Sequence, residues 1–180
     1  MKRLTMLVVG CSLLILGGLT SVLGQKDKGL NIPEKKDLPK LFKELKDKDG
    51  KVRADAAQLV GNFGQVQAKP VQEAVPALTD MVKSDTDAGA RRAAADALGK
   101  IGFDGAKTVP VLIETLKNDA DYAVRSAAAT SLGQFGKDAK EGIPALQEAI
   151  AAAKAAGKDD KNKAMVGKAA QGALKMLKGI

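Results

Sequence analysis

The chain has 180 residues, enough for one domain, and a formal net charge of +8. It contains no His and a single Cys, which excludes His-dependent catalysis, His-ligated metal sites and an internal disulfide. Hydrophobic residues make up 45% of the chain but aromatic residues only 3%, so the core must consist mainly of small aliphatic side chains, as in closely packed helices.

Residues 1–24 predict a secretory leader, because a short basic start precedes a run without any charge over residues 4–24. Cleavage after Gly24 would release an exported protein, periplasmic or secreted. About 20 apolar residues suffice to cross a bilayer, so an uncleaved anchor in the cytoplasmic membrane is the alternative. The tripeptide before Cys11 resembles a lipoprotein box, but we interpret Cys11 as an ordinary apolar residue because the apolar run continues beyond it.

The positive charge lies at the ends of the chain. Residues 25–37 are polar and charged, and predict a linker with little to bury. Residues 38–153 contain sixteen charges of each sign, whereas residues 154–180 contain seven Lys against two Asp. A neutral central region lacks the cations that neutralise phosphates, so we expect no nucleic-acid partner. The Lys-rich tail is the only candidate site for a polyanion.

One pattern recurs in residues 47–64, 85–102 and 119–136. A pattern that recurs at a fixed period predicts a repeat architecture. An Asp opens each copy, an Arg follows six residues later, and a Gly stands near the end. The aligned residues are Asp47, Asp85 and Asp119; Arg53, Arg91 and Arg125; and Gly61, Gly99 and Gly133.

Each copy predicts a pair of helices. An apolar residue and a Pro precede the copy, and aliphatic residues then recur at helical spacing, so we expect a first helix with Pro in its first turn. A second Asp in the turn is expected to cap the next helix. Gly64, Gly102 and Gly136 are expected in the left-handed conformation after that helix. The repeats extend over about residues 38–64, 75–102, 109–136 and 143–178.

The fourth copy departs from the pattern. We expect a first helix to about Ala156, an enlarged turn from Gly157 to Lys163, and a second helix from about Ala164 to Leu177. Gly167 replaces the Arg of the other copies. Lysines on the outer side would keep the end of the stack in water, as a terminal cap requires, and these are Lys168, Lys175 and Lys178.

The recurring pattern, Asp followed by Val-Arg or Ala-Arg, Ala-Ala and a Gly-containing end, resembles HEAT repeats, and is most similar to the short repeats of phycobilin-lyase-like proteins. Tetratricopeptide repeats have a similar period, but these copies lack their early aromatic residue. The resemblance covers residues 38 to about 178. It implies an all-α, right-handed α-solenoid of about four HEAT-like helical hairpins in residues 38–180.

The resemblance also implies a role for the aligned charges. In HEAT repeats the Asp of one repeat typically bonds the Arg of a neighbour, which would make Asp47, Asp85 and Asp119 with Arg53, Arg91 and Arg125 a structural ladder. An anion-binding ladder is the alternative. The three inner glycines suggest close approach of a neighbouring backbone, and a bound partner chain would also explain them.

A solenoid usually binds on its concave face, which the second helices line. The positions opposite their apolar sides are Ala54, Gln58, Arg92, Asp96, Ser126 and Thr130. This small, nearly neutral surface suits a protein or peptide partner, unless it is simply a solvated face. We expect no catalytic residue, cofactor or metal.

The sequence therefore predicts a non-catalytic, exported scaffold or adaptor for protein–protein interaction. Two alternatives are a membrane-tethered structural module and an accessory subunit of a lyase-type enzyme.

Overall fold

The computed structural model describes residues 32–157 and 159–179, and these contain helices and no strand. The predicted leader and the start of the linker lie outside the described residues. The helices pair into four hairpins: α1 (Leu38–Glu44) with α2 (Gly50–Val66), α3 (Val75–Ser84) with α4 (Ala88–Ile101), α5 (Gly105–Asn118) with α6 (Tyr122–Phe135), and α7 (Ile143–Ala156) with α8 (Lys161–Lys178). The predicted all-α solenoid is confirmed.

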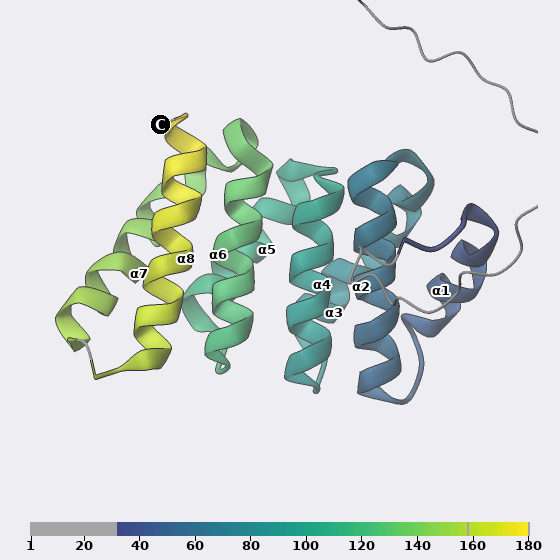
Figure 1. The fold of residues 1–180 in the computed structure, drawn as a ribbon, viewed down its shortest axis with the longest axis horizontal. Coiled ribbons are helices and arrows are strands. Elements are labelled where there is room, and N and C mark those ends of the chain that lie inside the picture. Colours follow the sequence, from purple (N-terminus) through teal and green to yellow (C-terminus); the bar gives the residue numbers. More distant parts are fainter. Residues whose placement is uncertain (1–31, 158, 180) are drawn as a thin grey trace, which may run out of the picture.

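The hairpins stack in sequence order. Figure 1 shows α2, α4, α6 and α8 side by side, with α1 and α7 at opposite ends of the molecule. The second helices contact one another in succession, α2 with α4, α4 with α6, and α6 with α8. Each first helix also contacts the second helix of its own hairpin. Stacking therefore buries the apolar sides of neighbouring hairpins against one another.

Aspartates in the turns start the second helices. The side chain of Asp49 accepts a hydrogen bond from the backbone N–H of Lys51 at 2.8 Å, and that of Asp87 accepts one from Ala90 at 2.8 Å. Asp121 and Asp160 cap α6 and α8 in the same way. These bonds satisfy N–H groups that have no partner within the helix, and the carboxylate charge complements the helix dipole.

One continuous core runs between the two layers of helices. The Leu that follows each Pro is buried in all four hairpins: Leu41, Leu78, Leu112 and Leu146. Small residues fill much of the remainder, including Ala94, Ala95, Ala128 and Ala129, which are completely buried. Within the described part of the chain, every fully buried side-chain nitrogen or oxygen has a hydrogen-bond partner.

The aligned glycines let the second helices approach closely. A Cβ atom on Gly61 would lie 2.7 Å from Cα of Ala97, and one on Gly133 would lie 2.8 Å from Cα of Ala173. The neighbouring repeat therefore explains these glycines, as the sequence suggested. Contacts between successive first helices are much less extensive. Because the second helices pack against one another more extensively than the first helices, we call the exposed side of α2, α4, α6 and α8 the inner face.

Three details differ from the sequence prediction. Gly64 does not end a helix, because α2 continues to Val66 and Gly64 is buried against Ile101 and Val71. Pro110 lies inside α5 rather than in its first turn, since the segment before it is already helical from Gly105. In the other repeats this approach segment is a 3-10 helix, as in η2 (Lys69–Ala74) and η3 (Gly136–Gly142).

The turns and the linker also differ slightly from expectation. Asp160 caps α8, so this helix begins at Lys161 and the last turn is shorter than predicted. The end of the linker forms a short 3-10 helix, η1 (Lys35–Asp37), which leads into α1. Gly102, in contrast, has the left-handed conformation expected of it, with φ 59° and ψ 31°. Gly136 also has a positive φ, but its ψ lies outside the left-handed helical region.

Candidate functional site

Two aligned Arg residues connect consecutive repeats. Arg53 donates from Nε to Oδ2 of Asp85 at 2.6 Å and from Nη2 to Oδ1 at 2.5 Å. Arg91 binds Asp119 in the same bidentate manner, at 2.7 and 2.9 Å. Each guanidinium also donates from Nη1 to a turn carbonyl of its own repeat. Arg53 donates to the carbonyl of Asp47, and Arg91 donates to that of Asp85. The donors of both side chains are thus directed at the protein itself, as in a structural ladder.

The ladder ends at Asp47 and Arg125, which the sequence had placed in it. Among the described residues, no hairpin precedes that of α1 and α2 to supply an Arg to Asp47, and its carboxylate accepts instead from the backbone N–H of Asp49. Beyond Arg125 the corresponding position is Ala153, which has no carboxylate. Among residues 32–157 and 159–179, Arg125 forms no salt bridge; it donates to the carbonyl of Leu116 and lies 5.2 Å from the ring centre of Tyr122.

The paired aspartates are held in their charged form. The hydrogen bonds from Arg53 lower the pKa of Asp85 by more than burial raises it. Burial also acts to raise the pKa of Asp119, but the Arg91 guanidinium and the N–H of Asp121 outweigh it, so the pKa is lowered. Ion pairs that are mostly buried and fully hydrogen-bonded are features of folding, so the ladder does not provide an anion site.

The inner face contains the residues that were predicted to meet a partner. Gln58, Arg92 and Thr130 are exposed on α2, α4 and α6, while Asp96 and Ser126 are half-buried. Ala54 is half-buried beside them on α2. Because α2, α4 and α6 contact one another in succession, these residues form a continuous surface along the stack. The surface is polar and mixed in charge toward α2.

Asp96 occupies the middle of the inner face. Burial raises its pKa above the ordinary value of a carboxyl group, against the opposing charges of Arg92 and Lys100. In the described part of the chain its carboxylate accepts no hydrogen bond, whereas the ladder aspartates accept several. A desolvated carboxylate with neighbouring cations but no fixed donor is a suitable acceptor for the N–H groups of a bound chain.

The inner face becomes apolar between α6 and α8. A hollow of about 400 Å³ lies there, and its principal lining residues are Ser126, Thr130, Met165, Lys168, Gly172 and Met176. Met165 and Met176 are 39% and 55% exposed, although their side chains are large and apolar. The sequence pattern indicated Ser126 and Thr130 as surface residues but not the two methionines. Their helical spacing of eleven residues was a usable signal, because it places them on the same side of α8.

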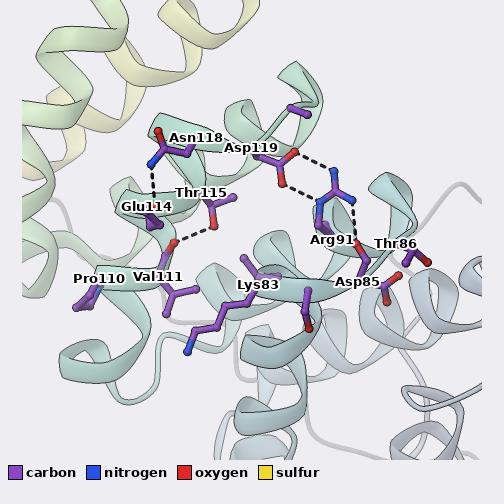
Figure 2. A pocket seen from close by; sticks show the side chains of 13 residues that line it. Lys83, Asp85, Thr86, Arg91, Pro110, Val111, Glu114, Thr115, Asn118 and Asp119 are labelled. Carbon is purple, nitrogen blue, oxygen red and sulfur yellow. Dashed lines mark hydrogen bonds and ion pairs between the residues drawn. The ribbon is translucent and has the colours of Figure 1, made fainter.

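A larger groove lies on the opposite side, between α3 and α5. One part has a volume of about 750 Å³ and an adjoining part about 680 Å³, and Lys83, Pro110 and Val111 line both. Figure 2 shows that several polar side chains here have partners within the protein: Arg91 binds Asp119, Asn118 binds Glu114, and Thr115 binds the carbonyl of Val111. The groove follows from the wide spacing of the first helices, and its polar groups leave few donors for a ligand.

Neither a metal-binding cluster nor a membrane-spanning helix is found among residues 32–157 and 159–179. No group of three or more His, Cys, Asp or Glu side chains in this part of the chain could hold a metal ion. None of its helices has the length and hydropathy that crossing a bilayer requires. The inner face is a shaped surface with an apolar hollow at one end.

Comparison with known proteins supports this architecture. The family model of HEAT repeats matches the sequence over residues 38–117 and 102–158. Among solved structures, one similar chain belongs to the complex of CpcE and CpcF of phycocyanin lyase from Nostoc sp., with a TM-score of 0.54 and 22% sequence identity. The likeness covers 89% of this chain and 71% of that one, and at this identity it shows the fold alone. No curated protein matches the sequence significantly.

Proposed function

The chain belongs to the HEAT-repeat family, and we propose that it is a non-catalytic adaptor that binds another protein on its inner face. The observation that carries this proposal is the contrast between the two sides of the stack. Most polar groups of the outer groove apart from Lys83 have partners within the protein, whereas the inner face exposes two methionines and presents Asp96, whose carboxylate accepts no hydrogen bond from the described residues. Exposed apolar side chains beside unpaired polar groups are typical of protein-binding surfaces.

The inner face also has the adaptability that such a surface needs. Met side chains are unbranched and polarisable, so they adjust to the shape of a bound chain. The helix α8 that carries them is held against α6 by the close contact of Gly133 with Ala173, and the Arg53 and Arg91 rungs fix the preceding repeats. A rigid backbone with adaptable side chains limits the conformational entropy that binding removes.

Site-specific photo-crosslinking in the organism that makes the protein tests this proposal. A p-benzoyl-phenylalanine would replace Gln58 or Thr130 on the inner face, and the matched controls would replace Glu114 or Gln147 on the first helices. All four positions are exposed. We expect the inner positions to give an adduct with one common protein and the outer positions not to do so. Adducts from the outer positions alone, or from none, would refute the proposal.

An accessory role in a lyase-type enzyme is the second candidate. It is supported by the likeness to a chain of the CpcE and CpcF complex, in which two proteins assemble. This candidate would make the partner another lyase subunit and would bring a pigment to the assembled complex. The visible absorption spectrum of the complex isolated from its host tests this role: an absorbing chromophore is expected, and a featureless spectrum would exclude it.

We further propose that the protein acts outside the cytoplasm. The proposal rests on the uncharged run over residues 4–24 after a basic start. Sequencing of the amino terminus of the native protein distinguishes the two forms. Gln25 as the first residue would support an exported protein, whereas an intact Met1 in a membrane fraction would support the tethered alternative.

A further inference from the structure

The hollow between α6 and α8 contains a glycine that the fold does not explain. A Cβ atom on Gly172 would meet no atom within 4 Å, whereas one on Gly133 would contact the neighbouring helix. A glycine inside a helix costs about 1 kcal/mol relative to Ala, and Gly172 brings no packing in return. Its lack of a side chain deepens the hollow between Met165 and Met176 instead.

The charge around the hollow has one sign. α8 contains five Lys and no acidic residue, and only Lys163 among them forms a salt bridge within the described residues, with its cap Asp160. Lys168 lines the hollow directly and is exposed. α6 contributes no carboxylate either, since Asp121 lies before its first residue. A ligand at this end of the inner face therefore meets apolar walls and unneutralised ammonium groups.

From this combination we propose that the hollow binds an acidic protein segment through one large apolar side chain, which enters over Gly172 between the two methionines. Carboxylates on either side of that anchor pair with Lys168 and the other lysines of α8. This inference rests on the proposed function, because it assigns the chemistry of the partner to one end of the inner face. Apolar anchors in pockets typically carry most of the binding energy of an interface, and complementary charges direct the encounter.

The shape of the site favours a protein segment over an anionic membrane. The apolar residues line a recess between two helices, which a single side chain can enter. A lipid surface would require the apolar groups to protrude in one plane, with the lysines around them. Thr130 lines the hollow and also belongs to the polar part of the inner face, so a bound chain can extend from the hollow along the stack.

Selection of random peptides of about 16 residues, long enough for about four helical turns, against the full-length protein tests the inference. We expect the selected peptides to share a large apolar residue flanked by Asp and Glu. Gly172→Leu, which fills the hollow, and Lys168→Glu, which reverses its charge, should each weaken a selected peptide by at least about tenfold. The controls Gln147→Glu and Lys43→Glu, on the first helices, should leave its affinity unchanged. Fluorescence anisotropy of the labelled peptide measures its affinity for all four variants.

Gly172→Ala separates binding from folding. It should raise the melting temperature, because Ala favours the helix, and still weaken the selected peptide because its methyl group enters the hollow. Peptides without acidic residues, or affinities unaffected by Gly172→Leu and Lys168→Glu, would overturn the inference. If the peptides then respond to Asp96→Arg, the inner face binds proteins elsewhere and the proposed function stands. If the peptide affinities respond neither to the changes in the hollow nor to Asp96→Arg, both the inference and the proposed function fail.

Vesicles of phosphatidylcholine and phosphatidylglycerol provide the remaining comparison. We expect no binding that depends on Lys168 and Met176. Vesicle binding that is lost in Lys168→Glu and Met176→Gln, together with selected peptides that show no acidic preference, would assign the surface to membranes and would overturn the inference.

Discussion

Arg53 of the first repeat binds both carboxylate oxygens of Asp85 in the second, at 2.6 and 2.5 Å, and the carbonyl of Asp85 accepts from Arg91. Asp85, in the turn between α3 and α4, therefore connects the two consecutive second helices α2 and α4. The pair is mostly buried, with side-chain exposures of 15% for Arg53 and 4% for Asp85. This arrangement fixes the rotation between repeats and, with it, the shape of the inner face.

Removal of one partner of this rung should destabilise the fold severely. We expect Arg53→Met to lower the free energy of unfolding by about 3 kcal/mol, because Asp85 would be left as a poorly compensated buried charge. Urea denaturation followed by circular dichroism measures the change. The control Glu44→Gln removes the half-buried partner of the exposed Lys40 and should cost no more than about 0.5 kcal/mol. Equal losses in the two variants would contradict a structural role for the ladder.

The rungs also predict acid sensitivity. The folded-state pKa values of Asp85 and Asp119 are lowered, so their stabilisation is complete above the unfolded pKa of about 3.9 and is lost as the pH falls through the folded values. The melting temperature should therefore fall as the pH decreases below about 4. Arg53→Met with Asp85→Leu should show a shallower fall, because one rung is gone. An identical pH dependence in both proteins would exclude the rung as its origin.

Asp96 should behave in the opposite way. Burial raises its folded-state pKa, so its contribution to stability is present below the unfolded pKa and is lost as the pH rises through the folded value. Asp96→Asn should therefore be more stable than the parent at pH 7, and the two melting temperatures should converge near pH 3. A parent protein that is the more stable one at pH 7 would show that Asp96 has a stabilising partner.

Two glycines in neighbouring helices should respond oppositely to the same change. Gly133→Ala places a methyl group 2.8 Å from Cα of Ala173 and should destabilise the protein by about 1 to 3 kcal/mol, since backbone cannot move aside cheaply. Gly172→Ala meets open space and should stabilise it by about 1 kcal/mol. Thermal unfolding measures the change in stability that each of the two variants causes. Destabilisation by both variants would show that Gly172 has a packing role.

The periodic features of this fold were predictable because they arise from local chemistry. Asp caps, aliphatic spacing and the left-handed Gly102 all depend on residues close in sequence. The pairing of Arg53 with Asp85 came from the family resemblance, since no spacing within one repeat identifies a partner in the next. Gly64 and Pro110 were misassigned because the approach segments between repeats are helical or nearly so, and they contain no periodic apolar signal.

The apolar part of the candidate site was not predictable in the same way. Met165 and Met176 share one side of α8, but only the packing of α6 against α8 shows that Ser126 and Thr130 complete a hollow with them. Nor does the sequence separate Gly172 from Gly133, because a glycine in a helix looks the same whether its Cβ position is occupied or open. Contacts between residues far apart in sequence decide both questions.

Isothermal titration calorimetry with the partner captured by crosslinking tests the central claim most directly. Thr130→Glu places a charge and added bulk in the inner face, and Gln147→Glu places the same side chain on α7 as a control. Binding on the inner face predicts a loss of affinity of at least about thirtyfold for Thr130→Glu and less than about threefold for Gln147→Glu. Unchanged affinity for Thr130→Glu, with a loss for Gln147→Glu, would show that the partner binds the outer helices instead of the inner face.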